Sequence, residues 1–126
     1  LRVLSEPEAE IIQKKGYILF ARRGGQVIGT CALLKVDDRT YEIAKMAVTE
    51  SQQRKQAGRK LALAAIERAR SLGAEMVFLK TDPRLKAAVS LYRSLGFVTS
   101  QETPLLSDRY QREKMGILMK LDLQER

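Results

Sequence analysis

The chain has 126 residues, which is enough for one domain with its own hydrophobic core. It contains one cysteine, Cys31, and no histidine, so a disulfide framework within the chain, a Ser-His-Asp triad and most zinc sites are excluded. The formal net charge of +8 favours an anionic partner, and no apolar stretch approaches the roughly 20 residues that a membrane span needs.

The first half of the chain has the pattern of an antiparallel meander. Residues 5–16 are predicted to form a short polar helix or loop. Apolar strands are predicted at 17–21, 26–34 and 41–48. Gly24 and Gly25 between the first two strands are typical of a hairpin turn. Alternation along the third strand, YEIAKMAV, places Glu42, Met46 and Val48 on one face.

The second half changes to helical spacing. A first helix is predicted after residue 57, with Gly73 at its C-terminal end. A second helix is expected to open with Asp82 as N-cap, to bury a stripe from Leu85 to Leu95, and to end at Gly96. Further strands are predicted at 76–81, 97–101 and 116–123. The strand–helix–strand order implies a parallel crossover joined to the meander, so the expected fold class is α/β (α+β), in a single domain of residues 1–126.

A basic, small-residue turn stands between the third strand and the first helix. Its sequence is QQRKQAGRKL, residues 52–61. The helix start would offer free backbone N–H groups, and Arg54, Lys55, Arg59 and Lys60 would add positive charge. This pattern favours a phosphate-binding site, and the alternative is a solvated basic helix start. The turn is neither a Walker loop nor a dinucleotide fingerprint, because it lacks Gly-Lys-Ser/Thr and the required glycine spacing.

Three stretches, in this order, resemble the GNAT superfamily of N-acetyltransferases over roughly residues 17–123. They are YEIAKMAV, the segment Gln53-Arg54-Lys55-Gln56-Ala57-Gly58 set against Gln/Arg-x-x-Gly-x-Gly/Ala, and AVSLYRSLGF. The resemblance implies a GNAT-like mixed sheet, in which an antiparallel N-terminal meander precedes a β-α-β-α-β unit and the N-terminal helices are shortened or absent. It also implies acetyl-CoA as co-substrate and an amine as acetyl acceptor.

The resemblance further implies where acetyl-CoA binds. Backbone N–H groups from Gln53 to Gly58 would cradle the pyrophosphate, and the strand backbone at 46–48, splayed from its neighbour, would pair with the pantetheine arm. The expected cofactor residues are Met46, Ala47, Val48, Gln53, Arg54, Lys55, Gln56, Ala57, Gly58, Arg59, Lys60, Asp82 and Tyr92. Gln56 replaces the first motif glycine, so its side chain is expected either to crowd the pyrophosphate and oppose a positive φ or to donate a hydrogen bond. Asp82 stands where the family often has Asn.

Acetyl transfer needs a proton donor for the leaving thiolate and an acceptor for the amine proton. By resemblance Tyr92 is the general acid, and the alternative is a purely structural core residue. Glu42 is the candidate base, and the alternative is a solvent-facing carboxylate. Cys31 is expected to be a small buried apolar residue rather than an acyl carrier, and no metal is expected. Tyr110 and Arg112 border the expected acceptor side, where contact with substrate and contact with solvent are equally open.

The leading functional interpretation is an N-acetyltransferase in which a primary amine of a small molecule or protein attacks acetyl-CoA directly. The alternative is a non-catalytic acyl-CoA-binding or sensor domain of a larger regulator. A nucleic-acid-binding module is suggested by charge alone and disfavoured because aromatic residues make up only 6% of the chain. The net charge favours an acidic or neutral acceptor over a polyamine. We also expect a cytoplasmic protein, with a homodimer covering the exposed sheet if the N-terminal helices are missing.

Overall fold

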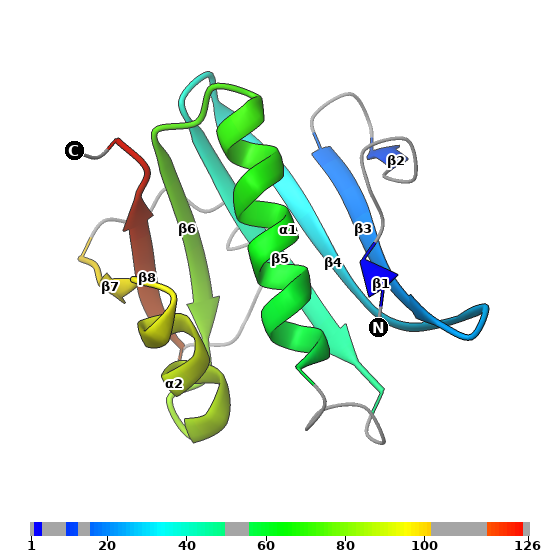
Figure 1. Cartoon of the computed structure of the whole chain (residues 1–126). Coiled ribbons are helices and arrows are strands. Elements are labelled where there is room, and N and C mark those ends of the chain that lie inside the picture. Colours follow the sequence, from blue (N-terminus) through cyan, green and yellow to red (C-terminus); the bar gives the residue numbers. More distant parts are fainter. Residues whose placement is uncertain (1, 4–9, 13–15, 50–55, 102–115, 125–126) are drawn as a thin grey trace.

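A computed structural model describes residues 2–3, 10–12, 16–49, 56–101 and 116–124 (Figure 1). The strands are β1 (Arg2–Val3), β2 (Glu10–Ile12), β3 (Gly16–Arg23), β4 (Gln26–Asp37), β5 (Thr40–Val48), β6 (Met76–Thr81), β7 (Val98–Thr99) and β8 (Ile117–Asp122), and the helices are α1 (Ala57–Ser71) and α2 (Lys86–Ser94). All strands belong to one mixed sheet in the order β1-β3-β4-β5-β6-β8-β7, and β2 pairs separately with β3. The sheet is antiparallel except between β5 and β6, which confirms the predicted meander and crossover.

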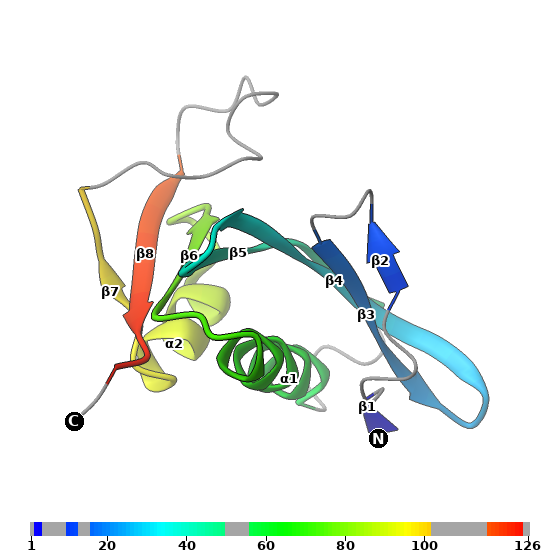
Figure 2. The same cartoon turned by 90° about the horizontal axis from the view of Figure 1, so that it is seen from above.

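Both helices lie on the same face of the sheet, as Figure 2 shows. α1 packs along β4 and β5 through an apolar stripe in which Leu61, Ala62 and Ala65 are fully buried. Gly29 of β4 makes this close approach feasible, because a Cβ built there would lie 2.9 Å from Leu61 Cδ1. The core therefore occupies the layer between the sheet and α1. Neither described helix has the length and apolar character that crossing a membrane requires.

Glycines in the left-handed region end both helices, as predicted. Gly73 has φ 91° and Gly96 has φ 104°. The chain then turns back, so that Ala74 N–H donates to the Ala69 carbonyl and Phe97 N–H donates to the Tyr92 carbonyl, each at 3.0 Å. These bonds satisfy carbonyls that the helix ends would otherwise leave without partners.

Residues 10–12 correct the expectation of a polar helix or loop across 5–16. They form β2 and pair in antiparallel register with Gly16–Ile18 of β3. The edge of β3 supplies backbone partners, and Ile11 and Ile12 are β-branched residues that favour a strand. The residues described ahead of β3, which are 2–3 and 10–12, contain no helix. The other strand predictions hold within a few residues at their ends, although β7 covers only two of the five residues expected at 97–101.

A bulge in β5 corrects the predicted face of Glu42. Ala44 pairs with Ala32 and Ala47 pairs with Thr30, so two residues of β5 stand opposite Cys31 alone. Lys45, the first of the two, has φ 55°. The extra residue reverses the alternation beyond it. Met46 and Val48 therefore pack against the core with Ile43, on the side of α1, whereas Glu42 lies on the face without helices.

The start of α2 also differs from the prediction. The helix begins at Lys86 with Leu85 at the N-cap, and Leu85 makes no side-chain capping bond. Asp82 instead accepts a hydrogen bond from Arg84 N–H at 2.9 Å and pairs with the Arg84 guanidinium. Asp side chains often bind backbone two residues ahead, and this local turn competes with helix capping. Leu85, expected in the buried stripe of the helix, is 56% exposed.

Candidate active site

A cleft of about 750 Å³ opens between β5, the start of α1 and α2. It arises because β5 pairs with β6 only from Thr40 to Glu42 and the two strands then diverge, as Figure 1 shows. The predicted splay of β5 from its neighbour is thus present. The described residues that line the cleft are Met46, Val48, Gln56, Gly58, Arg59, Arg84, Leu85, Lys86, Ala87, Ala88, Leu91 and Tyr92.

The N-terminus of α1 is open toward this cleft. Gln56 stands at the N-cap, and its carbonyl accepts the first helical hydrogen bond from Lys60 N–H at 3.0 Å. No side chain among the described residues caps the helix, and its first turn contains no acidic residue. Free N–H groups and the positive end of the helix dipole therefore remain available to an anion.

Gln56 corrects the expectation that its side chain would oppose a positive φ. Its backbone adopts φ 71° and ψ 13°, the left-handed conformation in which glycine is usual. The turn into α1 thus keeps a glycine-like shape although the residue is Gln. Such a conformation costs a residue with a side chain on the order of 1–2 kcal/mol.

Gly58 leaves room in the cleft. A Cβ built on it would lie 3.7 Å from Leu91 Cδ2 and 4.0 Å from Val48 Cγ2, which are ordinary contact distances. The free protein would accept alanine here without rearrangement. Val48 and Leu91 both line the cleft, so Gly58 presents the start of α1 to it without a bulky side chain.

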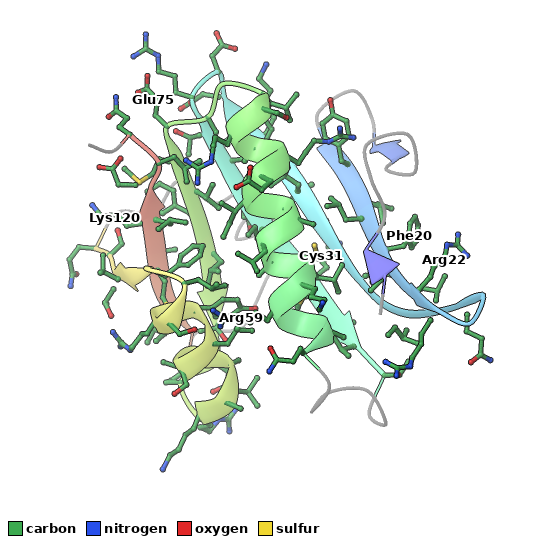
Figure 3. The ribbon with its side chains drawn as sticks, in the orientation of Figure 1. Phe20, Arg22, Cys31, Arg59, Glu75 and Lys120 are labelled. Atoms are coloured by element: carbon green, nitrogen blue, oxygen red, sulfur yellow. The ribbon has the colours of Figure 1, made fainter. Side chains whose placement is uncertain are left out.

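Arg59 connects the two helices at the cleft. Its Nη1 donates a hydrogen bond to Ser94 Oγ at 2.9 Å, and Ser94 Oγ donates in turn to the Leu91 carbonyl at 2.6 Å. Figure 3 shows Arg59 reaching from the first turn of α1 toward α2. One cation is thus held beside the open N–H groups of α1, where it adds to their attraction for an anion.

Tyr92 is the one buried residue of α2, and it borders the cleft. Its ring meets the edge of Phe97 at a centroid distance of 5.9 Å. Burial, reinforced by the nearby Cys31 thiol, raises the pKa of Tyr92 to about 12. The phenol therefore keeps its proton at neutral pH and can act as a hydrogen-bond or proton donor. Burial likewise raises the pKa of Cys31 to about 12, which agrees with its predicted role as a buried apolar residue.

Glu42 lies at the apex of the splay, where it forms the last register pair of β5 with β6, opposite Phe78. Only 1% of its surface is exposed, so it is not the solvent-facing carboxylate of the alternative interpretation. It does not line the cleft on the helix side. Its side chain lies on the face of the sheet that carries no helix.

Comparison with known proteins identifies the family. The model of the acetyltransferase (GNAT) family matches residues 3–97. The chain belongs to the GNAT family. YvbK, an uncharacterized N-acetyltransferase of Bacillus subtilis (strain 168), is 36% identical over 100 residues, which are 77% of this chain and 64% of YvbK. The chain thus spans slightly less than two thirds of that relative.

Solved structures agree with this GNAT assignment. A Bacillus subtilis acetyltransferase crystallised in complex with CoA is 30% identical, with a TM-score of 0.73 over 89% of this chain and 80% of that one. An IAA acetyltransferase from Bacillus cereus ATCC 14579 is 28% identical, with a TM-score of 0.73 over 87% of this chain and 79% of that one. The mixed sheet with two helices on one face is therefore the GNAT fold.

The cleft of this GNAT chain brings together six of the eleven described residues that the sequence predicted for the site. Those that line it are Met46, Val48, Gln56, Gly58, Arg59 and Tyr92. Those that are described but do not line it are Glu42, Ala47, Ala57, Lys60 and Asp82. Gln53, Arg54, Lys55, Tyr110 and Arg112 lie outside the described residues. Ala57 is buried in the core, and Ala47 pairs with Thr30 on the face away from the helices.

Sequence reasoning missed the part of the cleft that the start of α2 provides. The unpredicted lining residues are Arg84, Leu85, Lys86, Ala87, Ala88 and Leu91. The spacing of Leu85, Ala88 and Leu91 does indicate one helix face, but the same spacing is typical of a stripe buried in a core. Most of α2 is not buried, which shows that this face lines the cleft and is not part of a core. The burial of a helix is known only from the fold.

Proposed function

We propose that this protein transfers an acetyl group from acetyl-CoA to a primary amine of a small molecule or protein, by direct attack of the amine. One observation carries the proposal. The protonated phenol of Tyr92 and the open N-terminus of α1 line the same cleft, at the splay between β5 and β6. Membership of the GNAT family and the CoA complex of the 30%-identical relative support it.

The residues of the cleft fit CoA. The N–H groups at the start of α1, together with Gly58 and Arg59, would hold the pyrophosphate, and Gln53, Arg54 and Lys55 are proposed to continue that loop. Met46 and Val48 give an apolar wall, and the β5 backbone beyond its pairing with β6 is proposed to bind the amides of the pantetheine arm. Bound there, acetyl-CoA would supply the activated acetyl group.

Tyr92 is proposed as the general acid, whose phenol stabilises the leaving thiolate by donating a hydrogen bond to it. Its pKa of about 12 lies above that of a thiol, so the phenol is protonated when the thiolate forms and donates to it through a hydrogen bond. Phe97 holds the Tyr92 ring by its edge contact and by the bond from its N–H to the Tyr92 carbonyl. A backbone N–H near Val48 is proposed to stabilise the negative charge on the acetyl oxygen.

The amine is proposed to arrive from the face without helices. The cofactor cleft occupies the helix side of the splay, and Glu42 stands at its apex on the opposite side. From there the Glu42 carboxylate could take the amine proton directly or through a water molecule. The class of acceptor, the homodimer and the cytoplasmic location stay predictions from the sequence.

The deciding experiment is calorimetric titration with acetyl-CoA, followed by measurement of thiol release with a panel of amines. We expect saturable binding, its loss in Gly58→Glu, and thiol release that depends on the amine. Gly58→Glu adds bulk and negative charge beside the proposed pyrophosphate site. No binding to the unmodified protein would contradict the acetyl-CoA assignment. Binding without thiol release from any amine would favour the acyl-CoA sensor instead.

The roles of Tyr92 and Glu42 are separated by single substitutions. Tyr92→Phe should lower kcat by roughly 10²–10⁴ and leave acetyl-CoA affinity within a few fold, because only the proton donor is removed. Glu42→Gln should lower kcat/KM for the amine at low pH more than at high pH, where the amine is already neutral. Tyr41→Phe, at a buried tyrosine that does not line the cleft, is the matched control. Equal turnover in Tyr92→Phe and Tyr41→Phe would show that Tyr92 is a structural residue and not the general acid.

A further inference from the structure

Lys45 is an exposed lysine on the part of β5 that has diverged from β6. Pairing between the two strands ends at Glu42, three residues before it. Lys45 is the first residue of the bulge and has φ 55°, which costs a residue with a side chain on the order of 1–2 kcal/mol. No ion pair links its ammonium group to another described residue. Backbone strain of this kind is concentrated at functional sites, and here it presents a primary amine.

The bulge lies at the level of Tyr92 in the molecule. Cys31 of β4 stands alone opposite the two bulge residues, Lys45 and Met46. The Cys31 thiol contributes to the raised pKa of Tyr92, so these two side chains lie close together in the core. Met46 and Tyr92 both line the cleft. The backbone of Lys45 therefore passes the place where Tyr92 would meet the thioester of acetyl-CoA.

The other described lysines are less well placed to reach that thioester. Three of them already have interaction partners, namely Lys35, Lys80 and Lys120. Lys60 is exposed on α1 and does not line the cleft. Lys86 does line it, but six residues of α2 separate Lys86 from Tyr92, which is about 9 Å along the helix axis. Lys45 alone among the described lysines combines an exposed amine with a place at the level of Tyr92.

We propose, on the basis of the proposed function, that the protein acetylates its own Lys45 from acetyl-CoA bound in the cleft. The Nζ atom of Lys45, in its neutral form, attacks the thioester carbonyl carbon, so that an amide N–C bond forms and the C–S bond breaks. The sulfur leaves with the electron pair of that bond. It takes up one of the two protons that the lysine ammonium loses, and water accepts the other. Since donor and amine belong to one complex, the reaction is intramolecular and needs no amine substrate.

The test incubates the protein with acetyl-CoA, without added amine, and locates acetyl groups by mass spectrometry. We expect Lys45 to be acetylated at least about tenfold faster than Lys60 and Lys86, which are exposed but lie away from the level of Tyr92. Thiol release should show a first phase of one equivalent per chain. This phase should disappear in Lys45→Arg, which keeps the charge, and persist in Lys35→Arg, the matched control near the end of β4.

Gly58→Glu distinguishes acetylation from the cleft from direct chemical acetylation by the reagent. In this variant, Lys45 should be acetylated no faster than Lys60. When Gly58→Glu is mixed with the unmodified protein, acetyl groups should appear at Lys45 of the unmodified copy alone, because the reaction is intramolecular. Acetylation of the Gly58→Glu copy by its neighbour would refute the intramolecular step and favour a protein amine as acceptor.

The remaining outcomes separate self-acetylation from the function on which it rests. Equal rates at Lys45 and Lys60 in the unmodified protein, together with saturable acetyl-CoA binding by calorimetry, would refute self-acetylation while the acetyl-CoA assignment stands. If acetyl-CoA does not bind, the proposed function itself fails, and self-acetylation fails with it. Fast acetylation of Lys45 that is lost in Gly58→Glu and confined to the unmodified copy supports the proposal.

Discussion

Two residues at the cleft have a backbone conformation that usually requires glycine. Lys45 has φ 55° immediately before Met46, and Gln56 has φ 71° at the start of α1. Residues in such conformations store strain, and strain of this kind is concentrated at functional sites. Here both residues shape the cleft. Lys45 turns Met46 toward the core side, and Gln56 presents the open N-terminus of α1.

Gln56→Gly should raise the free energy of unfolding by about 0.5–1 kcal/mol. Relief of left-handed strain exceeds the extra entropy that glycine gives the unfolded chain. Urea denaturation measures the change, and Lys45→Gly, which relieves strain of the same kind outside α1, should give a similar gain. Acetyl-CoA titration of the same variant tests the side chain: tighter binding means that Gln56 crowds the ligand, and weaker binding means that its amide contributes.

Cys31 should react very slowly with thiol reagents in the native protein. Its pKa of about 12 leaves roughly a thousandth of the thiolate that a thiol with the ordinary value of 9.0 has at neutral pH, and burial blocks access as well. Alkylation followed by mass spectrometry, with and without denaturant, checks this. Rapid modification of the folded protein would show that the core between α1 and β4 opens readily.

At the scale of elements, apolar periodicity was sufficient to predict both helices and most strands, because it reflects the side that each element buries. Apolar periodicity failed where a single extra residue in a strand reverses the alternation of its two faces. The bulge at Lys45 leaves no apolar signature, and it moved Glu42 and Met46 to opposite faces. The predicted start of α2 was wrong because an Asp side chain can accept a backbone N–H bond either as a helix N-cap or in a local turn. Asp82 does the second.

The resemblance to a family supplied what periodicity could not. The basic turn at 52–61 indicates an anion site by its own composition, but the role of Tyr92 came only from the motif around it. Its burial, its raised pKa and its place beside the cleft are properties of the packed core. The cations at the start of α2 could not be assigned to the cleft from sequence, because exposed Arg and Lys residues are common on any basic surface.

Two glycines at the junction of β4, β5 and α1 should respond in opposite ways to alanine. Gly29→Ala forces a Cβ to within 2.9 Å of Leu61 Cδ1 and 3.2 Å of the Ala47 carbonyl oxygen, so we expect a loss of about 1–3 kcal/mol in unfolding free energy. Gly58→Ala meets nothing closer than 3.7 Å and should keep or slightly raise stability, since alanine favours a helix.

Variants of Gly58 also test the cleft. Gly58→Ala should change acetyl-CoA affinity by no more than a few fold, because the family motif accepts Gly or Ala at this position, whereas the larger, charged side chain of Gly58→Glu should abolish binding. Calorimetry measures both affinities, and chemical denaturation checks that each variant is folded. Undiminished binding in Gly58→Glu would mean that the ligand does not approach the start of α1 closely.

At the scale of the whole molecule, burial of Tyr92 and Cys31 should make the fold sensitive to alkali. Tyr92 keeps its proton to about pH 12 in the folded state, whereas an unfolded tyrosine loses it near about pH 10. Between these values the unfolded chain binds fewer protons than the folded one, so the free energy of unfolding falls as pH rises. The contribution is complete below about pH 10 and lost by about pH 12, and Cys31 acts in the same direction from its lower ordinary value.

Denaturation with urea at several pH values between about 9 and 11 measures this loss. Its slope should reach about 1.4 kcal/mol per pH unit for each buried group once the unfolded form ionises. Tyr92→Phe should flatten the curve above about pH 10. A curve for Tyr92→Phe parallel to that of the unmodified protein would contradict the burial of this phenol.

Three residue pairs provide all the strand pairing between β5 and β6, so the sheet is weakly joined at its middle. An extended ligand bound along β5 and against α2 would supply hydrogen bonds where β5 no longer pairs with β6. It would thereby stabilise the middle of the sheet. Amide hydrogen exchange should then slow in β6 and β8 as well as in β5 when the ligand binds. Ligand release and local opening of the sheet would be one event, governed by a single rate.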